Sequence, residues 1–172
     1  MSEIESINDL NADLFSAEEV DRFSDPKEAR KKAMDYLARR EYGQRELEQK
    51  LIAAGFEVVT ATDAVHKLSG EGLQDDRRFI ENFVQSRINQ GKGPVRIRQE
   101  LGERGVSEGM IEEVFDDVAE DWYALARQIR EKKFGSDLPR NFTEKARQMR
   151  FLQYRGFESG HIQAAVSPHG DD

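Results

Sequence analysis

The chain of 172 residues contains no cysteine, one tryptophan, four prolines and only three histidines. Without cysteine, disulfide bonds and thiolate metal sites are excluded, and we expect a reducing compartment, the cytoplasm. No apolar run approaches the roughly 18 residues that a membrane span requires, so we expect no contact with a membrane. The first residues show neither the basic region nor the apolar region of a secretory signal.

Charge, in contrast, is abundant and unevenly distributed. Charged residues make up 35% of the chain, and the net charge is −8. Residues 1–25 hold eight acids against Arg22 alone, a composition typical of a disordered acidic tail. Leu10, Leu14 and Phe15 nevertheless have helical spacing, which leaves open packing on a partner or on the body of the protein. The other 147 residues hold 26 acids and 25 bases, so the acidity belongs mostly to the tail.

The strongest signal is an internal repeat. Gly55, Gly105 and Gly156 lie 50 and 51 residues apart, and each glycine follows a leucine by four positions. This spacing predicts three helices that each end at a left-handed glycine. Apolar residues also recur six, nine and ten positions past each glycine, which predicts one face of a short helix that follows.

The sequence therefore predicts an all-α fold made of three tandem three-helix repeats in an elongated array. We expect helices over 26–40, 44–54 and 60–69, then over 75–90, 94–104 and 107–118, and finally over 121–134, 142–154 and 158–166. The corresponding division is an acidic tail at 1–25, repeats at 26–72, 73–120 and 121–167, and a short tail at 168–172. Such an array offers surface for partners and no deep pocket.

Residues suited to catalysis or metal binding are sparse. His66, His161 and His169 lack further ligands at metal-binding spacing, and no acid–base pair or nucleophile stands out, so we expect no enzyme activity, metal or cofactor. The segment from Gly91 to Pro94 is either a tight turn with Pro94 at the first helical position, which we favour, or a helix start that meets a phosphate.

Two acidic clusters have ordinary structural explanations. Asp75 and Asp76 precede a helix and are suited to cap it. A ridge of carboxylates is either a solvated helix face, which we favour, or a contact for a basic protein; it comprises Glu112, Glu113, Asp116, Asp117, Glu120 and Asp121.

Basic side chains supply the candidates for partner binding. Arg98 is the foremost, because no carboxylate lies one turn away to neutralise it, whereas Arg96 can pair with Glu100 and should matter less. The Arg98 guanidinium is either free to hold a carboxylate or a phosphate of a partner, or it is solvated or bonded to a neighbouring repeat, and the sequence favours neither alternative. Nearby aromatic residues, Tyr42, Phe151 and Tyr154, either stack on single-stranded bases or pack internally. The remaining candidates are Lys92, Arg39, Arg40, Arg45, Arg147, Arg150 and Arg155.

Arg87 differs from these candidates because it lies on the buried side of its helix. An unpaired buried charge is costly, so this placement predicts a carboxylate partner from another helix and a structural role.

Many of these residues together resemble the central motif of the RecX family, the regulators of the RecA recombinase. The motif residues are Leu73, Asp75-Asp76-Arg77-Arg78-Phe79, Phe83-Val84, Arg87, Gly91-Lys92-Gly93-Pro94, Arg96-Ile97, Leu101 and Gly105-Val106. Similar patterns occur around Gly55-Phe56 and Gly156-Phe157, so the resemblance covers residues 27 to 166. Gly43 departs from it, standing where the family often has a serine-like helix cap.

The resemblance implies a curved array that binds RecA on single-stranded DNA in the filament groove and modulates RecA without catalysis. From it we expect an inhibitor of recombination and of the SOS response, with only weak direct contact to single-stranded DNA. Separately, we expect a monomer. The positions that specify the fold would be Asp76, Phe79, Phe83, Arg87, Gly91, Gly93, Pro94, Ile97, Leu101 and Gly105. The alternative is a direct nucleic-acid binder, because three-helix units also build helix-turn-helix readers, although near-neutral repeats count against it.

Overall fold

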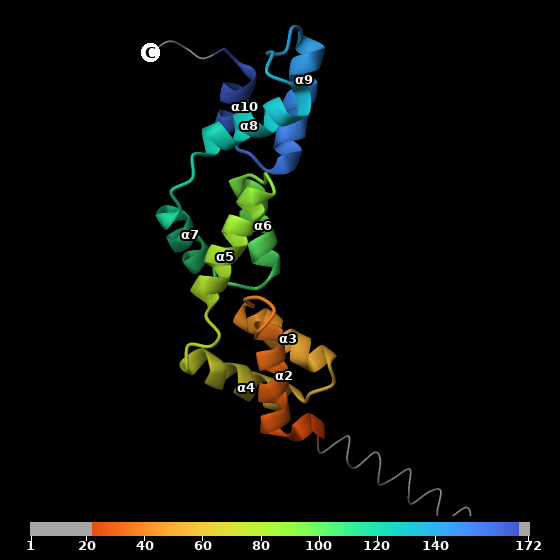
Figure 1. Cartoon of the computed structure of the whole chain (residues 1–172), viewed down its shortest axis with the longest axis vertical. Coiled ribbons are helices and arrows are strands. Elements are labelled where there is room, and N and C mark those ends of the chain that lie inside the picture. Colours follow the sequence, from red (N-terminus) through yellow and green to blue (C-terminus); the bar gives the residue numbers. More distant parts are fainter. Residues whose placement is uncertain (1–21, 169–172) are drawn as a thin grey trace, which may run out of the picture. The chain divides into compact units, whose positions relative to one another are not determined.

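The structure, a computed structural model, describes residues 22–168. All regular secondary structure in this range is helical, which confirms the all-α prediction (Figure 1). The predicted acidic tail up to residue 21 and most of the predicted C-terminal tail, residues 169–172, lie outside the described residues. The chain divides into two compact units, Met1–Phe79 and Ile80–Asp172. Within residues 22–168, none of the helices combines the length and the hydropathy that a membrane span requires.

The first unit is a bundle of three helices, α2 (Pro26–Leu37), α3 (Gln44–Ala53) and α4 (Val58–Gly70). Helix α2 begins where the Asp25 side chain accepts a hydrogen bond from the Lys27 backbone N–H, with Pro26 in the first turn. Apolar side chains at helical spacing on all three helices form one core, which includes Ala29, Ala33, Leu47, Leu51, Ala61, Val65 and Leu68.

Phe23 extends this core toward the N-terminus. Its ring meets Phe56 edge to face with centroids 5.5 Å apart, and it covers Gly55 so closely that a Cβ there would lie 2.7 Å from the ring. The predicted boundary of the acidic tail at residue 25 is therefore too late, because residues 22–25 belong to the folded unit.

Two aspartates at the end of the first unit have different roles. Asp75 caps α5 (Asp76–Asn89), since its Oδ1 accepts from the Arg78 backbone N–H at 3.1 Å. Asp76 instead accepts from the backbone N–H of Gln44, at 2.7 Å, and from the Gln74 side chain. Gly43 precedes α3 and has no side chain to cap it, so Asp76 supplies that cap from 32 residues away.

The second unit holds most of α5 and five further helices: α6 (Pro94–Glu103), α7 (Glu108–Asp117), α8 (Trp122–Phe134), α9 (Phe142–Arg155) and α10 (Ser159–Val166). Helix α8 packs on α10 and α9, and α6 packs on α7. The apolar positions of the family motif, Phe79, Phe83, Ile97 and Leu101, are all buried.

The three repeat glycines end their helices as predicted. Gly55, Gly105 and Gly156 have φ of 112°, 78° and 93°, the left-handed range that favours glycine. After Gly55 and Gly156 the next backbone N–H, that of Phe56 or Phe157, donates to the carbonyl five residues back. The observed helices match the predicted ranges within a few residues; the largest difference is that α2 ends at Leu37 and not at residue 40.

Candidate partner-binding surface

Within the second unit, the start of α6 meets the end of α9. The Gly93 N–H donates to the Arg155 carbonyl and the Val95 N–H to the Gly156 carbonyl, each at 2.9 Å. Helix starts leave N–H groups and helix ends leave carbonyls without partners, so this junction satisfies both and joins the positive end of one helix dipole to the negative end of the other. These N–H groups are thus occupied, which favours the turn interpretation of Gly91–Pro94 over a phosphate site.

Glycine at position 93 is required by space and not by backbone conformation. Its φ is −84°, which any residue can adopt, yet a Cβ would lie 2.4 Å from the carbonyl carbon and oxygen of Gly156. Gly91 has φ of 76° and faces the side chain of Ile129, and Pro94 occupies the first turn of α6. The glycines of the motif therefore hold the second and third repeats in contact.

Glu100 of α6 gathers three cations. Its carboxylate accepts from Arg87 Nε at 3.0 Å and from Lys92 Nζ at 2.8 Å, and Arg96 Nε lies 3.7 Å away. Burial raises the pKa of Glu100, but the hydrogen bonds from Lys92 and Arg87 outweigh burial and leave that pKa below its ordinary value. The predicted carboxylate partner for Arg87 on another helix is confirmed. Lys92, a candidate for partner binding, has its charge matched within the chain.

Arg98 is not free, and of the two alternatives for it the internal bond is the one observed. Its Nε donates to Glu112 of α7 at 2.9 Å, its Nη1 lies 3.7 Å from Glu158, and its guanidinium stacks 4.2 Å above the Phe115 ring. Both carboxylates are far along the chain, so a search one turn away on the same helix could not find them. The Arg98–Glu112 ion pair also accounts for one member of the carboxylate ridge, since Glu112 of α7 binds an arginine of the same chain.

Three further candidates also have internal partners. Arg96 Nη1 donates to the Tyr154 carbonyl at 3.1 Å, and Arg155 Nη1 donates to the Gln90 carbonyl at 3.1 Å. Arg40 pairs with Glu46 at 2.7 Å and lies over the ring of Tyr42, which is buried. These contacts show that the three side chains stabilise the fold, whether or not they also contact a partner.

The other candidates are exposed and have no carboxylate partner among residues 22–168. They are Arg39 and Arg45 in the first unit, and Arg147 and Arg150 on α9. The Arg147 guanidinium lies over the ring of Phe134, with 5.6 Å between guanidinium and centroid. These four side chains are the ones that the fold leaves available.

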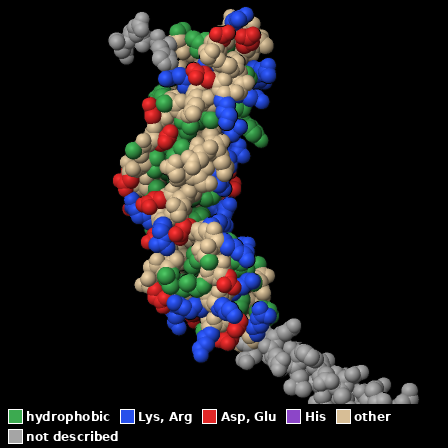
Figure 2. Space-filling view, in the orientation of Figure 1, with side chains coloured by type: hydrophobic (Ala, Val, Ile, Leu, Met, Phe, Trp, Pro, Cys, Tyr) green, Lys and Arg blue, Asp and Glu red, His purple; other side chains and the backbone are tan. Residues whose placement is uncertain are grey.

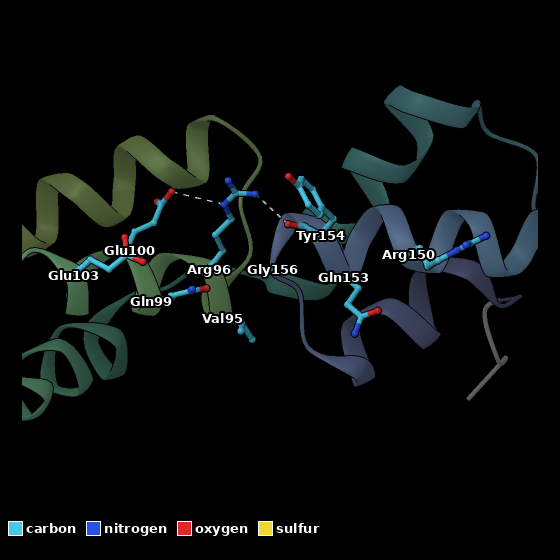
Figure 3. Close-up of a pocket in the computed structure, with 9 residues that line it drawn as sticks. All are labelled: Val95, Arg96, Gln99, Glu100, Glu103, Arg150, Gln153, Tyr154 and Gly156. Carbon is cyan, nitrogen blue, oxygen red and sulfur yellow. Dashed lines mark hydrogen bonds and ion pairs between the residues drawn. The ribbon is translucent and has the colours of Figure 1, made fainter.

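Arg147 and Arg150 belong to a stripe on α9, which we call the α9 stripe: Thr143, Arg147, Arg150 and Tyr154. Steps of four, three and four residues place these side chains on one helix face. Tyr154 is 79% exposed. Arg150, Tyr154 and Arg96 line a groove of about 690 Å³ between α9 and α6; Arg96 reaches toward Tyr154, and Arg150 lies farther along α9 (Figure 3).

The third repeat is also the basic one. Residues 122–166 carry nine bases and four acids, a net charge of +5, whereas residues 75–118 carry seven bases and ten acids, and residues 26–72 carry nine and eight. Lys and Arg side chains line the edge of the second unit where α9 lies (Figure 2). Residues 26–72 are thus nearly neutral by themselves, whereas the second and third repeats approach neutrality only in sum, which counting charge repeat by repeat would have shown.

Sequence reasoning also missed a buried arginine. Arg130 of α8 is 1% exposed, and its Nη1 donates to the carbonyl of Asp137 at 3.1 Å and to the side chain of Gln148 at 3.4 Å. It follows the buried Ala126 by four positions, the spacing that marks the inner face of a helix. Arg130 therefore fixes the loop between α8 and α9 from inside the repeat.

No group of three or more metal-ligating side chains occurs among the residues that the structure describes.

Comparison with known proteins identifies the chain's relatives. Three family models match in order: the first three-helix domain of RecX at residues 29–68, the second at 75–114 and the third at 119–166. The chain belongs to the RecX family.

Individual relatives agree with this assignment. The regulatory protein RecX of Halorhodospira halophila is 46% identical over 140 residues, which cover 81% of this chain and 87% of the relative. That of Ectopseudomonas mendocina is 42% identical over 77% of this chain and 88% of its own length. A crystal structure of RecX from Lactobacillus salivarius, 19% identical, covers 87% of this chain and 96% of its own with a TM-score of 0.69 and supports the fold.

Proposed function

We propose that this chain regulates RecA by binding the filament that RecA forms on single-stranded DNA, inhibiting recombination and the SOS response without catalysis of its own. The proposal places it in the cytoplasm as a monomer. Membership of a family of regulatory proteins supports it. The observation that carries it to particular residues is the α9 stripe, where two exposed arginines have no carboxylate partner in the described part of the chain.

The chemistry of the stripe suits a nucleoprotein filament. A guanidinium binds carboxylates and phosphates in bidentate fashion, and such a filament offers both groups. Arg147 and Arg150 lie one helical turn apart, and Tyr154 lies about one turn beyond them with an exposed ring that can stack on a base or a planar side chain. By contrast, Arg98 and Arg96 are engaged within the chain.

The test is inhibition of the DNA-dependent ATP hydrolysis of RecA. Replacing Arg147 and Arg150 together by alanine should raise the concentration for half-inhibition at least tenfold, while the melting temperature stays that of the parent. The matched control is Arg140→Ala, which removes an exposed arginine outside the stripe and should leave inhibition unchanged. Undiminished inhibition by the double variant would exclude the α9 stripe and leave Arg39 and Arg45 as the next positions to test.

A second function, direct binding of single-stranded DNA, is favoured by one observation, the net charge of +5 on residues 122–166. Binding that rests on phosphate contacts weakens steeply with salt. The test is titration of a labelled oligonucleotide without RecA at several salt concentrations. Tight, strongly salt-dependent binding that is lost in the Arg147 and Arg150 variant would make direct binding the primary activity, whereas weak binding beside intact inhibition supports the filament proposal.

A further inference from the structure

The first unit has a groove between α2 and α4 that no described residue fills. The groove has a volume of about 440 Å³, and its walls combine apolar surface from Pro26, Val59 and Ala64 with the cations Lys27 and Lys67. Val59 is 69% exposed and the neighbouring Val58 61% exposed. Two adjacent valines exposed to this degree at the start of a helix leave apolar area uncovered beside the groove.

The charges of the groove favour an acidic occupant. Neither Lys27 nor Lys67 forms an ion pair with any residue between 22 and 168, although Lys67 lies near enough to Glu71 to contribute to the lowered pKa of that carboxyl. Arg30, also in the wall, is held by Glu71 with an Nη2–Oε2 distance of 2.6 Å, and Asp63 is the single carboxylate among the lining residues. The groove therefore presents two ammonium groups without an ion pair beside apolar surface.

The chain itself supplies a segment with the complementary chemistry. Residues 1–21 contain seven acids and no base, and apolar side chains recur within this stretch at Leu10, Leu14, Phe15 and Val20. The described chain begins at Arg22, and Ser24 and Pro26 already belong to the groove wall. At roughly 3.3–3.6 Å per residue, the seven residue steps from Phe15 to Arg22 span up to about 25 Å, which lets Phe15 reach the wall at Ser24 and Pro26.

We propose that segment 10–20 docks in the groove between α2 and α4, with Leu14 and Phe15 against the apolar wall and its acidic side chains toward Lys27 and Lys67. The connection is short, so the segment experiences a high effective concentration at the groove compared with a separate molecule. The proposal concerns the first unit alone and is independent of the RecA-binding function.

Because the chain contains no cysteine, a disulfide can form only between cysteines that are introduced for the test. Cysteines are introduced at Ala17 and Val59 in the full chain, and the rate of intramolecular disulfide formation under a mild oxidant is compared with that of a control pair at Ala17 and Gln49, which is exposed on α3. We expect the groove pair to form its disulfide at least tenfold faster. Equal rates in the two pairs would overturn the proposal.

A second set of variants separates docking from the proximity that the short connection gives. Adding Leu14→Asp and Phe15→Asp to the groove pair should reduce its rate to that of the control, and Lys27→Glu with Lys67→Glu should slow it several-fold. A rate that none of these changes alters would show that proximity alone produces the crosslink and would overturn docking. A disulfide between two chains would assign the groove to a second copy and would likewise overturn it.

Discussion

Substitution of Gly93 by alanine tests the junction between α6 and α9. The added Cβ would lie 2.4 Å from the carbonyl of Gly156, so one of the two backbones must move. Overpacking of this kind costs about 1–3 kcal/mol. Movement also weakens the two backbone hydrogen bonds of the junction, from Gly93 and Val95, at about 0.5–1.5 kcal/mol each. Together these effects lower the free energy of unfolding by about 2–6 kcal/mol.

Gly102 provides a control on the same helix, since a Cβ there meets nothing within 4 Å. Alanine at this helical position should raise the free energy of unfolding by up to about 1 kcal/mol. Thermal unfolding followed by circular dichroism measures both variants, and about 1 kcal/mol shifts the melting temperature by about 4–8 °C for a unit of this size. A Gly93→Ala protein that melts like the parent, or a Gly102→Ala protein destabilised as strongly, would refute the steric explanation.

Three further substitutions test single interactions. Glu100→Gln should lower the free energy of unfolding, measured in urea, by about 1–2 kcal/mol. Glu103→Gln should leave that free energy unchanged, because Glu103 forms no ion pair among residues 22–168. Because the pKa of Glu100 is lowered on folding, its contribution is present above pH 4.5 and is lost as the pH falls below it, so the variant should lose less stability in acid than the parent does. Arg130→Lys should be destabilised in the same assay, since one ammonium cannot replace a buried guanidinium that reaches several acceptors; parental stability would contradict this. Phe23→Ala should lower the melting temperature by an amount that corresponds to about 1–3 kcal/mol, whereas Phe142→Ala, at a side chain 85% exposed, should not.

The repeat architecture could be predicted from sequence because local rules determine it. A leucine followed by glycine four positions later marks a helix that ends in a left-handed residue, and all three instances are observed. Periodicity then places each helix within a few residues. The elongated, curved arrangement of the whole array stays a prediction, which small-angle X-ray scattering of the protein would test.

The arginines show where local rules stop. Arg87 lies on the apolar side of its helix, so its burial alone requires a carboxylate partner, and Glu100 is that partner. Arg98 has no carboxylate one turn away on its own helix, which by itself favours a free guanidinium. Its partners, Glu112 and Glu158, are 14 and 60 residues away in sequence, and only the packing of α6 on α7 and the path of the third repeat bring them near. Helical spacing describes one helix at a time and carries no information about such contacts.

Some motif positions hold the fold together through internal contacts, and other arginines stay accessible to a partner. Motif residues of the second repeat are engaged in internal contacts. Asp76 caps a distant helix, Arg87 pairs with a carboxylate on another helix, and Gly93 permits the close approach of two backbones. A partner can recognise only side chains that remain accessible after such contacts are made. In the second unit the candidate arginines that keep no carboxylate partner among residues 22–168, Arg147 and Arg150, lie on α9, in a basic repeat that follows an acidic one. Because the repeats share one helical plan and differ in surface charge, charge and not fold distinguishes the face that a negatively charged partner would select.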